Sequence, residues 1–242
     1  MRRTWTGRAV RTGAAVAVAA AFVLPAGCAG HDRPARTGGN GPPSSAPAPA
    51  RGIPGVGGAL NSRVPSDSRQ VLAVYGKGAR SAESTAVLYA RSAGGWQRER
   101  SWAAHNGRHG WTTDHHEDDG KSPVGVFTLS DAGGVLPDPG TGLPYHRSAA
   151  FSAPRSWPRS YRRDFDLVIA IDYNRVKGRS PLDPDRPRGR SRGGGIWLHV
   201  DHGSGTAACV TQSRVDMEYL LRTLDPALHP VVVMGDRDAL SA

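Results

Sequence analysis

Histidine and cysteine lie close together in residues 193–212, which read GGGIWLHVDHGSGTAACVTQ. His199 ends an apolar run that predicts a strand, and Cys209 opens the next segment after a glycine-rich turn. Such a turn can bring both side chains to one end of a sheet. Cysteine attacks as its thiolate, and an adjacent imidazole lowers the thiol pKa and returns the proton to the leaving group. The stretch therefore predicts a cysteine nucleophile with a histidine base.

Other interpretations of these residues stay open at this point. A lone buried cysteine is often an inert core residue, and His199 after Trp-Leu could be a satisfied core side chain. His202 is a second candidate base, although it lies in the flexible turn. Because a base must be held within hydrogen-bond reach of the nucleophile, we favour His199.

The first 28 residues have the pattern of an export signal. A basic start is followed by an apolar run over residues 14–24, too short to span a bilayer, and then by Pro-Ala-Gly-Cys28. This ending resembles a bacterial lipobox, in which Cys28 would receive lipid. The lipid would tether the protein to the outer face of the cytoplasmic membrane. The alternative is ordinary cleavage of the signal followed by secretion. Residues 29–59, rich in Pro, Gly, Ser and Ala, predict a disordered tether.

Residues 60–242 are expected to form one domain that is mainly β, with one or two short helices. Gly and Pro punctuate short apolar and β-branched runs, a pattern typical of a β-sandwich. The predicted strands cover residues 71–75, 85–91, 96–104, 125–130, 167–173, 196–200 and 231–234. One helix is predicted after an N-cap at Ser213, with an apolar face that packs on the sheet: Met217, Leu220, Leu221 and Leu224.

Cysteine usage and charge narrow the function. If Cys28 is lipidated or removed, Cys209 has no partner in the exported chain, and an unpaired thiol in an oxidising compartment favours catalysis. The net charge of +10 suits an anionic partner such as a cell wall, and export argues against a nucleic acid. The arginine cluster at residues 186–192 is expected to be a mobile loop that recruits the anionic wall.

A second block lies upstream, where residues 114–119 read DHHEDD. Imidazole and carboxylate groups are zinc ligands, but consecutive residues in a loop lack the spacing that brings side chains onto one ion. We therefore predict a solvated loop, with no metal.

The segment GKSPVGVF, residues 120–127, resembles the signature DGK[ST]PxGx[FY] of the L,D-transpeptidase (YkuD-type) catalytic domain, a family of bacterial peptidoglycan cross-linking enzymes. The family's second signature, a histidine and then [ST]-x-G-C after a variable turn, resembles His199 followed by Thr206-Ala-Ala-Cys209. The two blocks stand in the family's order, behind an export signal, and the resemblance covers residues 60–235.

The resemblance implies a β-sandwich-like L,D-transpeptidase fold and a cysteine acyltransferase without metal or cofactor. Cys209 would attack the third-position carbonyl of a peptidoglycan tetrapeptide stem and expel D-alanine, with His199 as base and then acid. The amine of a second stem would resolve the acyl-enzyme into a 3–3 cross-link, or water would do so in an L,D-carboxypeptidase. Carbapenems would acylate Cys209. A catalytically degenerate wall-binding module is a further alternative.

The rest of the candidate site follows from acyl-transfer chemistry. The backbone N–H groups of Ala208 and Cys209 are the expected oxyanion donors, and Gly205 and Thr206 would support the turn. Ala208 departs from the family's usual glycine, and a positive φ there would strain it by about 1–2 kcal/mol. Thr211 replaces the family's arginine or asparagine, which puts substrate affinity in doubt. Four residues are candidates for the cleft wall: Tyr145, His146, Trp157 and Tyr173.

Overall fold

The structure is a computed structural model, and it describes residues 50–242. The predictions for the export signal, for Cys28 and for residues 29–49 lie outside the described residues. Residues 50–59, assigned above to the tether, belong to the folded unit: Ala50 pairs with Trp96, and Ile53 is only 2% exposed. The folded unit therefore begins before residue 60, because apolar side chains of this segment are buried against the sheet.

The fold is mainly β, as predicted, with short helices between or beside the strands. The strands are β1 (Gln70–Gly76), β2 (Glu83–Ser92), β3 (Gly95–His105), β4 (Trp111–Thr112), β5 (Ser122–Pro123), β6 (Gly125–Gly134), β7 (Tyr145–Arg147), β8 (Val168–Ile171), β9 (Trp197–Val200), β10 (Val210–Gln212) and β11 (Val231–Asp236). The α-helices are α1 (Gly58–Asn61), α2 (Arg214–Thr223) and α3 (Arg237–Ser241), and the 3₁₀ helices are η1 (Ala149–Phe151), η2 (Arg159–Asp166), η3 (Arg190–Arg192) and η4 (Pro226–Leu228).

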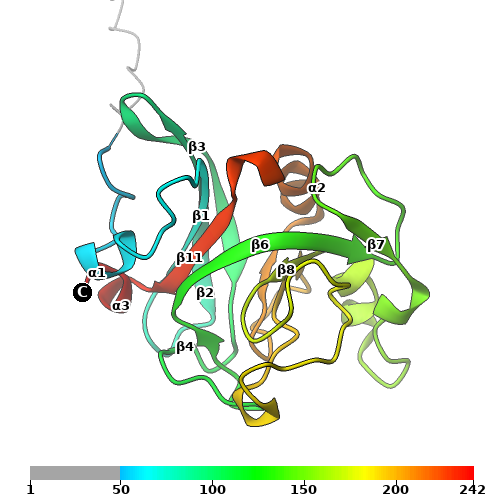
Figure 1. The fold of residues 1–242 in the computed structure, drawn as a ribbon. Coiled ribbons are helices and arrows are strands. Elements are labelled where there is room, and N and C mark those ends of the chain that lie inside the picture. Colours follow the sequence, from blue (N-terminus) through cyan, green and yellow to red (C-terminus); the bar gives the residue numbers. More distant parts are fainter. Residues whose placement is uncertain (1–49) are drawn as a thin grey trace, which may run out of the picture. The chain divides into compact units, whose positions relative to one another are not determined.

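Nine strands form one sheet in the order β11-β1-β2-β3-β10-β9-β8-β6-β7. β11 also pairs with β6, so the sheet closes into a barrel with β7 outside the ring. Figure 1 shows the long strand β6 curving across the front from β11 to β7. The predicted sandwich is not confirmed, because one continuous sheet closes on itself where a sandwich would need two separate sheets.

The predicted helix and all the predicted strands are present. α2 follows the expected N-cap, since the Ser213 side chain accepts a hydrogen bond from the Asp216 N–H. Its apolar residues Met217, Leu220 and Leu221 are fully buried in the same core cluster as Leu198 of β9 and Val210 of β10. Burial of this face is what holds the helix on the barrel.

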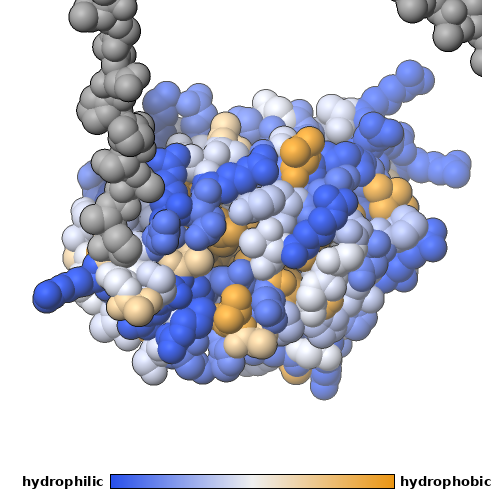
Figure 2. Space-filling model, turned by 90° about the horizontal axis from the view of Figure 1, so that it is seen from above, coloured by the Kyte–Doolittle hydropathy of each residue, from blue (hydrophilic) through white to orange (hydrophobic). Residues whose placement is uncertain are grey.

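A second apolar cluster covers the outside of β1 and β11. Leu60 of α1 and Leu240 of α3 pack there, and the two helices lie side by side (Figure 1). Seen from above, the surface is largely hydrophilic, with small separate hydrophobic patches (Figure 2). Within residues 50–242, no helix has the length and hydropathy needed to cross a membrane.

The placement of His199 and Cys209 follows from strand alternation. β9 and β10 are parallel neighbours, with Leu198 opposite Val210, and both of these side chains enter the barrel core. Successive side chains of a strand point to opposite faces, so His199 and Cys209 face outward. There η2 packs over β9 and covers them.

Candidate active site

His199 and Cys209 line the same cavity, which has a volume of about 370 Å³ and lies between the outer face of β9 and η2. The expected support residues Gly205 and Thr206 line it as well. The remaining lining residues are Arg108, Trp157, Pro158, Tyr161, Asp164, Phe165, His202 and Ala207. The fold therefore brings the two predicted catalytic side chains to one cavity, which is open to solvent and partly lined by aromatic rings.

The Cys209 thiol is held by backbone groups. The Trp197 N–H donates to Sγ at 3.3 Å, and Sγ lies 3.8 Å from the Gly195 carbonyl oxygen. Burial raises the pKa of Cys209 to about 11. No hydrogen bond joins Sγ to a histidine within residues 50–242. An adjacent imidazole was expected to lower this thiol pKa. Desolvation raises the pKa instead, so the Cys209 thiol is neutral in the free protein.

His199 is a neutral imidazole, and one of its two ring nitrogens is already hydrogen-bonded to the backbone. Its Nδ1 lies 2.9 Å from the Val200 carbonyl oxygen, a contact that requires Nδ1–H and leaves Nε2 as the proton acceptor. Burial lowers the pKa of His199 to about 4. The Phe165 ring packs edge-on against it at 5.0 Å between centroids. The ring is therefore fixed, uncharged at neutral pH and able to accept a proton at Nε2.

His202 is not in a flexible position, contrary to the expectation from its turn. Its Nδ1 lies 2.8 Å from Asp164 Oδ2, its side chain is 2% exposed, and its ring stacks on Tyr161 at 4.0 Å. Nε2 is enclosed and has no hydrogen-bond partner in the described part of the chain. Burial raises the pKa of Asp164 to about 6. His202 is thus a second rigid imidazole in the cavity, and mobility does not exclude it as a base.

Two side-chain hydroxyls fix the peptide planes on either side of Cys209. Ser122 Oγ donates to the Ala208 carbonyl at 2.7 Å and accepts from the Gly107 N–H at 2.9 Å. Thr206 Oγ1 donates to the Cys209 carbonyl at 2.7 Å. In a trans peptide the N–H points opposite to the carbonyl, so the bond from Ser122 also sets the direction of the Cys209 N–H. That N–H is one of the two expected oxyanion donors.

The departure at Ala208 causes no backbone strain. Its φ is not positive; within residues 50–242 the non-glycine residues with positive φ are Asp118, Asn174 and His229. Gly205 is constrained by space, since a Cβ there would lie 2.7 Å from the Cα of Arg108. Thr211 is buried, and its hydroxyl donates to Asp201 Oδ1 at 2.7 Å. Position 211 therefore supplies no free polar group to a substrate.

Replacing Ser122 with alanine is expected to slow acylation of Cys209 by on the order of tenfold, because the Ala208 carbonyl and the Cys209 N–H lose their fixed orientation. Intact-mass kinetics with a carbapenem measure the rate. Alkylation by iodoacetamide uses no oxyanion and should stay at the native rate. Ser130→Ala, which removes a hydroxyl bonded to Asp172 instead, is the control. Equal loss in both reactions would show that Ser122 only stabilises the fold.

The four residues predicted to line the cleft do not all lie at this cavity. Trp157 lines the cavity, whereas Tyr145, His146 and Tyr173 do not. Asp164, Tyr161, Phe165 and Arg108 line the cavity and were not singled out in the sequence. The recurrence of the aromatic residues Trp157, Tyr161 and Phe165 was the available signal, and in the structure the Trp157 ring packs edge-on against the other two.

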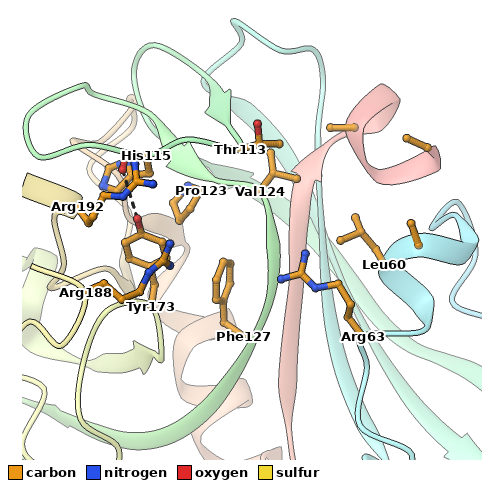
Figure 3. Close-up of a pocket in the computed structure, with 13 residues that line it drawn as sticks. Leu60, Arg63, Thr113, His115, Pro123, Val124, Phe127, Tyr173, Arg188 and Arg192 are labelled. Atoms are coloured by element: carbon orange, nitrogen blue, oxygen red, sulfur yellow. Dashed lines mark hydrogen bonds between the residues drawn. The ribbon is translucent and has the colours of Figure 1, made fainter.

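The acidic block and the arginine cluster meet beside a second cavity, of about 330 Å³. Arg188, Arg192, His115, Tyr173 and Phe127 are among its lining residues (Figure 3). Arg192 pairs with Asp114, and the Asn174 side chain donates to the carbonyls of Gly189 and Gly193. The segment expected to be a mobile loop is thus bonded in place and includes η3. Among the described residues, no group of three or more His, Cys, Asp or Glu side chains is arranged to hold a metal ion.

Comparison with known proteins gives little beyond this geometry. No family model matches the sequence, and no curated protein matches it. Among solved structures, the chain is similar to Bd1075 of Bdellovibrio bacteriovorus, with 19% sequence identity and a TM-score of 0.39. The match covers 70% of this chain and 48% of Bd1075, so the chain spans about half the length of that neighbour.

Proposed function

We propose that the protein is a cysteine acyltransferase of the L,D-transpeptidase type that acts on peptidoglycan stem peptides outside the cytoplasmic membrane. The observation that carries the proposal is the shared cavity: a neutral thiol and a neutral imidazole line one space of about 370 Å³. The resemblance of residues 120–127 and of the segment from His199 to Cys209 supplies the substrate class.

The reaction starts from uncharged groups. His199 Nε2 takes the thiol proton as Sγ bonds to the third-residue carbonyl carbon of a tetrapeptide stem. The carbon–nitrogen bond to D-alanine then breaks, and the same imidazole returns the proton to the leaving amine. In the second step the side-chain amine of another stem bonds to the carbonyl carbon, the carbon–sulfur bond breaks, and the amine proton returns to the thiolate.

Two features support this chemistry. The N–H groups of Ala208 and Cys209 donate no hydrogen bond to the described chain, so they are free to bind an oxyanion. The Ser122 hydroxyl holds the Ala208 carbonyl and so orients the Cys209 N–H before the reaction, while the Thr206 hydroxyl holds the peptide plane that follows Cys209.

The test is to incubate the full-length protein with disaccharide-tetrapeptide stems and to follow protein mass and products together. We expect an acyl adduct on Cys209, release of D-alanine and stem dimers joined through the side-chain amine. Cys209→Ala is the matched control and should form no adduct. Tripeptide without dimers would indicate the hydrolytic L,D-carboxypeptidase. A folded native protein that forms no adduct with stems or a carbapenem would contradict the proposal and leave the wall-binding module.

The arginine cluster is expected to strengthen attachment to the wall. Arg186, Arg188, Arg190 and Arg192 lie on one bonded segment, and Arg192 alone among them pairs with a carboxylate in the described chain. Changing all four to glutamine should reduce sedimentation with wall sacculi several-fold at low salt, and less at high salt, where screening already weakens the attraction. Unchanged binding at low salt would exclude this role.

A further inference from the structure

Arg108 is the one arginine or lysine among the residues that line the Cys209 cavity. Its guanidinium makes no ion pair and no hydrogen bond within residues 50–242, and the residue is exposed at the cavity rim. The one carboxylate in the lining, Asp164, is already bound to His202 at 2.8 Å. The cavity thus presents a single unpaired positive charge on a wall that otherwise holds aromatic, histidine and small side chains.

The backbone of Arg108 is fixed to the segment that carries the nucleophile. Its N–H donates to the Thr206 carbonyl at 2.8 Å, and the Thr206 N–H donates to the Asn106 carbonyl at 2.9 Å. Asn106 is fully buried, and its side chain donates to the Ser81 carbonyl and accepts from the Ser84 hydroxyl. These two backbone hydrogen bonds hold the Cα of Arg108 close to the turn that precedes Cys209.

The position also fits the chemistry of the leaving residue. In an amino acid released from the end of a peptide, the free carboxylate is separated from the departing nitrogen by only one carbon atom. A cation that binds this carboxylate must therefore stand near the nucleophile, at the side where the leaving group exits. A guanidinium suits the task because its planar fork binds a carboxylate through two parallel hydrogen bonds.

We propose that Arg108 binds the free carboxylate of the residue that leaves, so that the site selects peptides ending in a carboxylate next to the scissile bond. The inference rests on the proposed function and adds to it the group that sets substrate choice. Arg108 is a binding residue: it holds the leaving residue in place, and His199 still moves the proton.

The experiment compares two stem peptides that differ only at the terminal D-alanine, one with the free carboxylate and one with the amide. For the full-length native protein, kcat/KM for release of the terminal residue should favour the carboxylate by about 10–100-fold, the range for a hydrogen bond to a charged group. Arg108→Gln should bring this ratio close to one, and Arg108→Lys should leave an intermediate ratio. Arg98→Gln, which changes an exposed arginine of β3, should keep the native ratio.

The outcomes separate this inference from the proposed function. If the native protein releases D-alanine but Arg108→Gln keeps the full preference for the carboxylate, Arg108 does not bind it and only the inference is wrong. If the native protein acts on both peptides equally, the inference is also wrong. If neither peptide nor a carbapenem acylates Cys209, the proposed function fails and the inference fails with it.

Discussion

Replacing His199 with alanine is expected to slow acylation of Cys209 by on the order of 10²–10⁴-fold. The effect is large because the thiol of the free protein is neutral, with a pKa of about 11, and needs a base at the moment of attack. The Nδ1 bond of His199 to the Val200 carbonyl leaves Nε2 to serve as that base. The rate is measured by intact mass during incubation with a carbapenem.

Two controls decide whether the histidine acts as a base. Free imidazole should restore part of the rate to the His199→Ala protein, because the missing ring leaves a space of its own size, and such rescue is not expected from a purely structural loss. His202→Asn is the matched variant, since it removes the second buried imidazole of the cavity. A larger loss in His202→Asn than in His199→Ala would move the role of base to His202.

The Cys209 thiol is expected to stay protonated across the neutral range, with thiolate appearing only near pH 11. At pH 7 a group with this pKa is ionised to about one part in ten thousand. Burial is the cause, since the thiolate would lose its hydration and gain only the Trp197 N–H as a partner. The ultraviolet absorbance of the thiolate, taken as the difference between native and Cys209→Ser proteins over a pH series, measures the ionisation.

The pH at which the thiolate absorbance appears distinguishes a neutral thiol–imidazole pair from a thiolate–imidazolium pair. A neutral pair gives no thiolate absorbance at pH 7, and the signal increases as pH increases toward 11. A thiolate–imidazolium pair would give a strong signal already below pH 7. Detection of that signal would contradict the neutral resting state and would restore the activation by a charged histidine that the sequence suggested.

The strands, the helix and the juxtaposition of His199 with Cys209 were predictable because they depend on local patterns. Alternating apolar residues, a serine N-cap and a glycine-rich turn each have a direct physical meaning over a few residues. Barrel closure is different. It depends on β11 pairing with both β1 and β6, and no pattern within these strands distinguishes a closed sheet from a sandwich.

The wall of the cavity was harder to predict than the proximity of His199 and Cys209. Asp164 is buried against His202 although the two residues are far apart in the chain, and Ser122 reaches the Ala208 carbonyl from the other sequence block. Such contacts arise from tertiary packing and leave no local signal. The thiol pKa is a further example, because the sequence showed the nearby histidine but not how completely the sulfur would be buried.

Barrel closure also sets how late in folding the outer face of β9, where Cys209 lies, can be covered by η2. The first strand of the barrel is hydrogen-bonded to the last, so no stretch shorter than residues 70–236 contains all the strands that must pair. Contacts of such long range form late in folding. Until then the Cys209 thiol has the ionisation of an unfolded cysteine and is open to oxidation. Packing of η2 over the outer face of β9 then buries the sulfur in its protonated form, and a buried neutral thiol reacts slowly with oxidants.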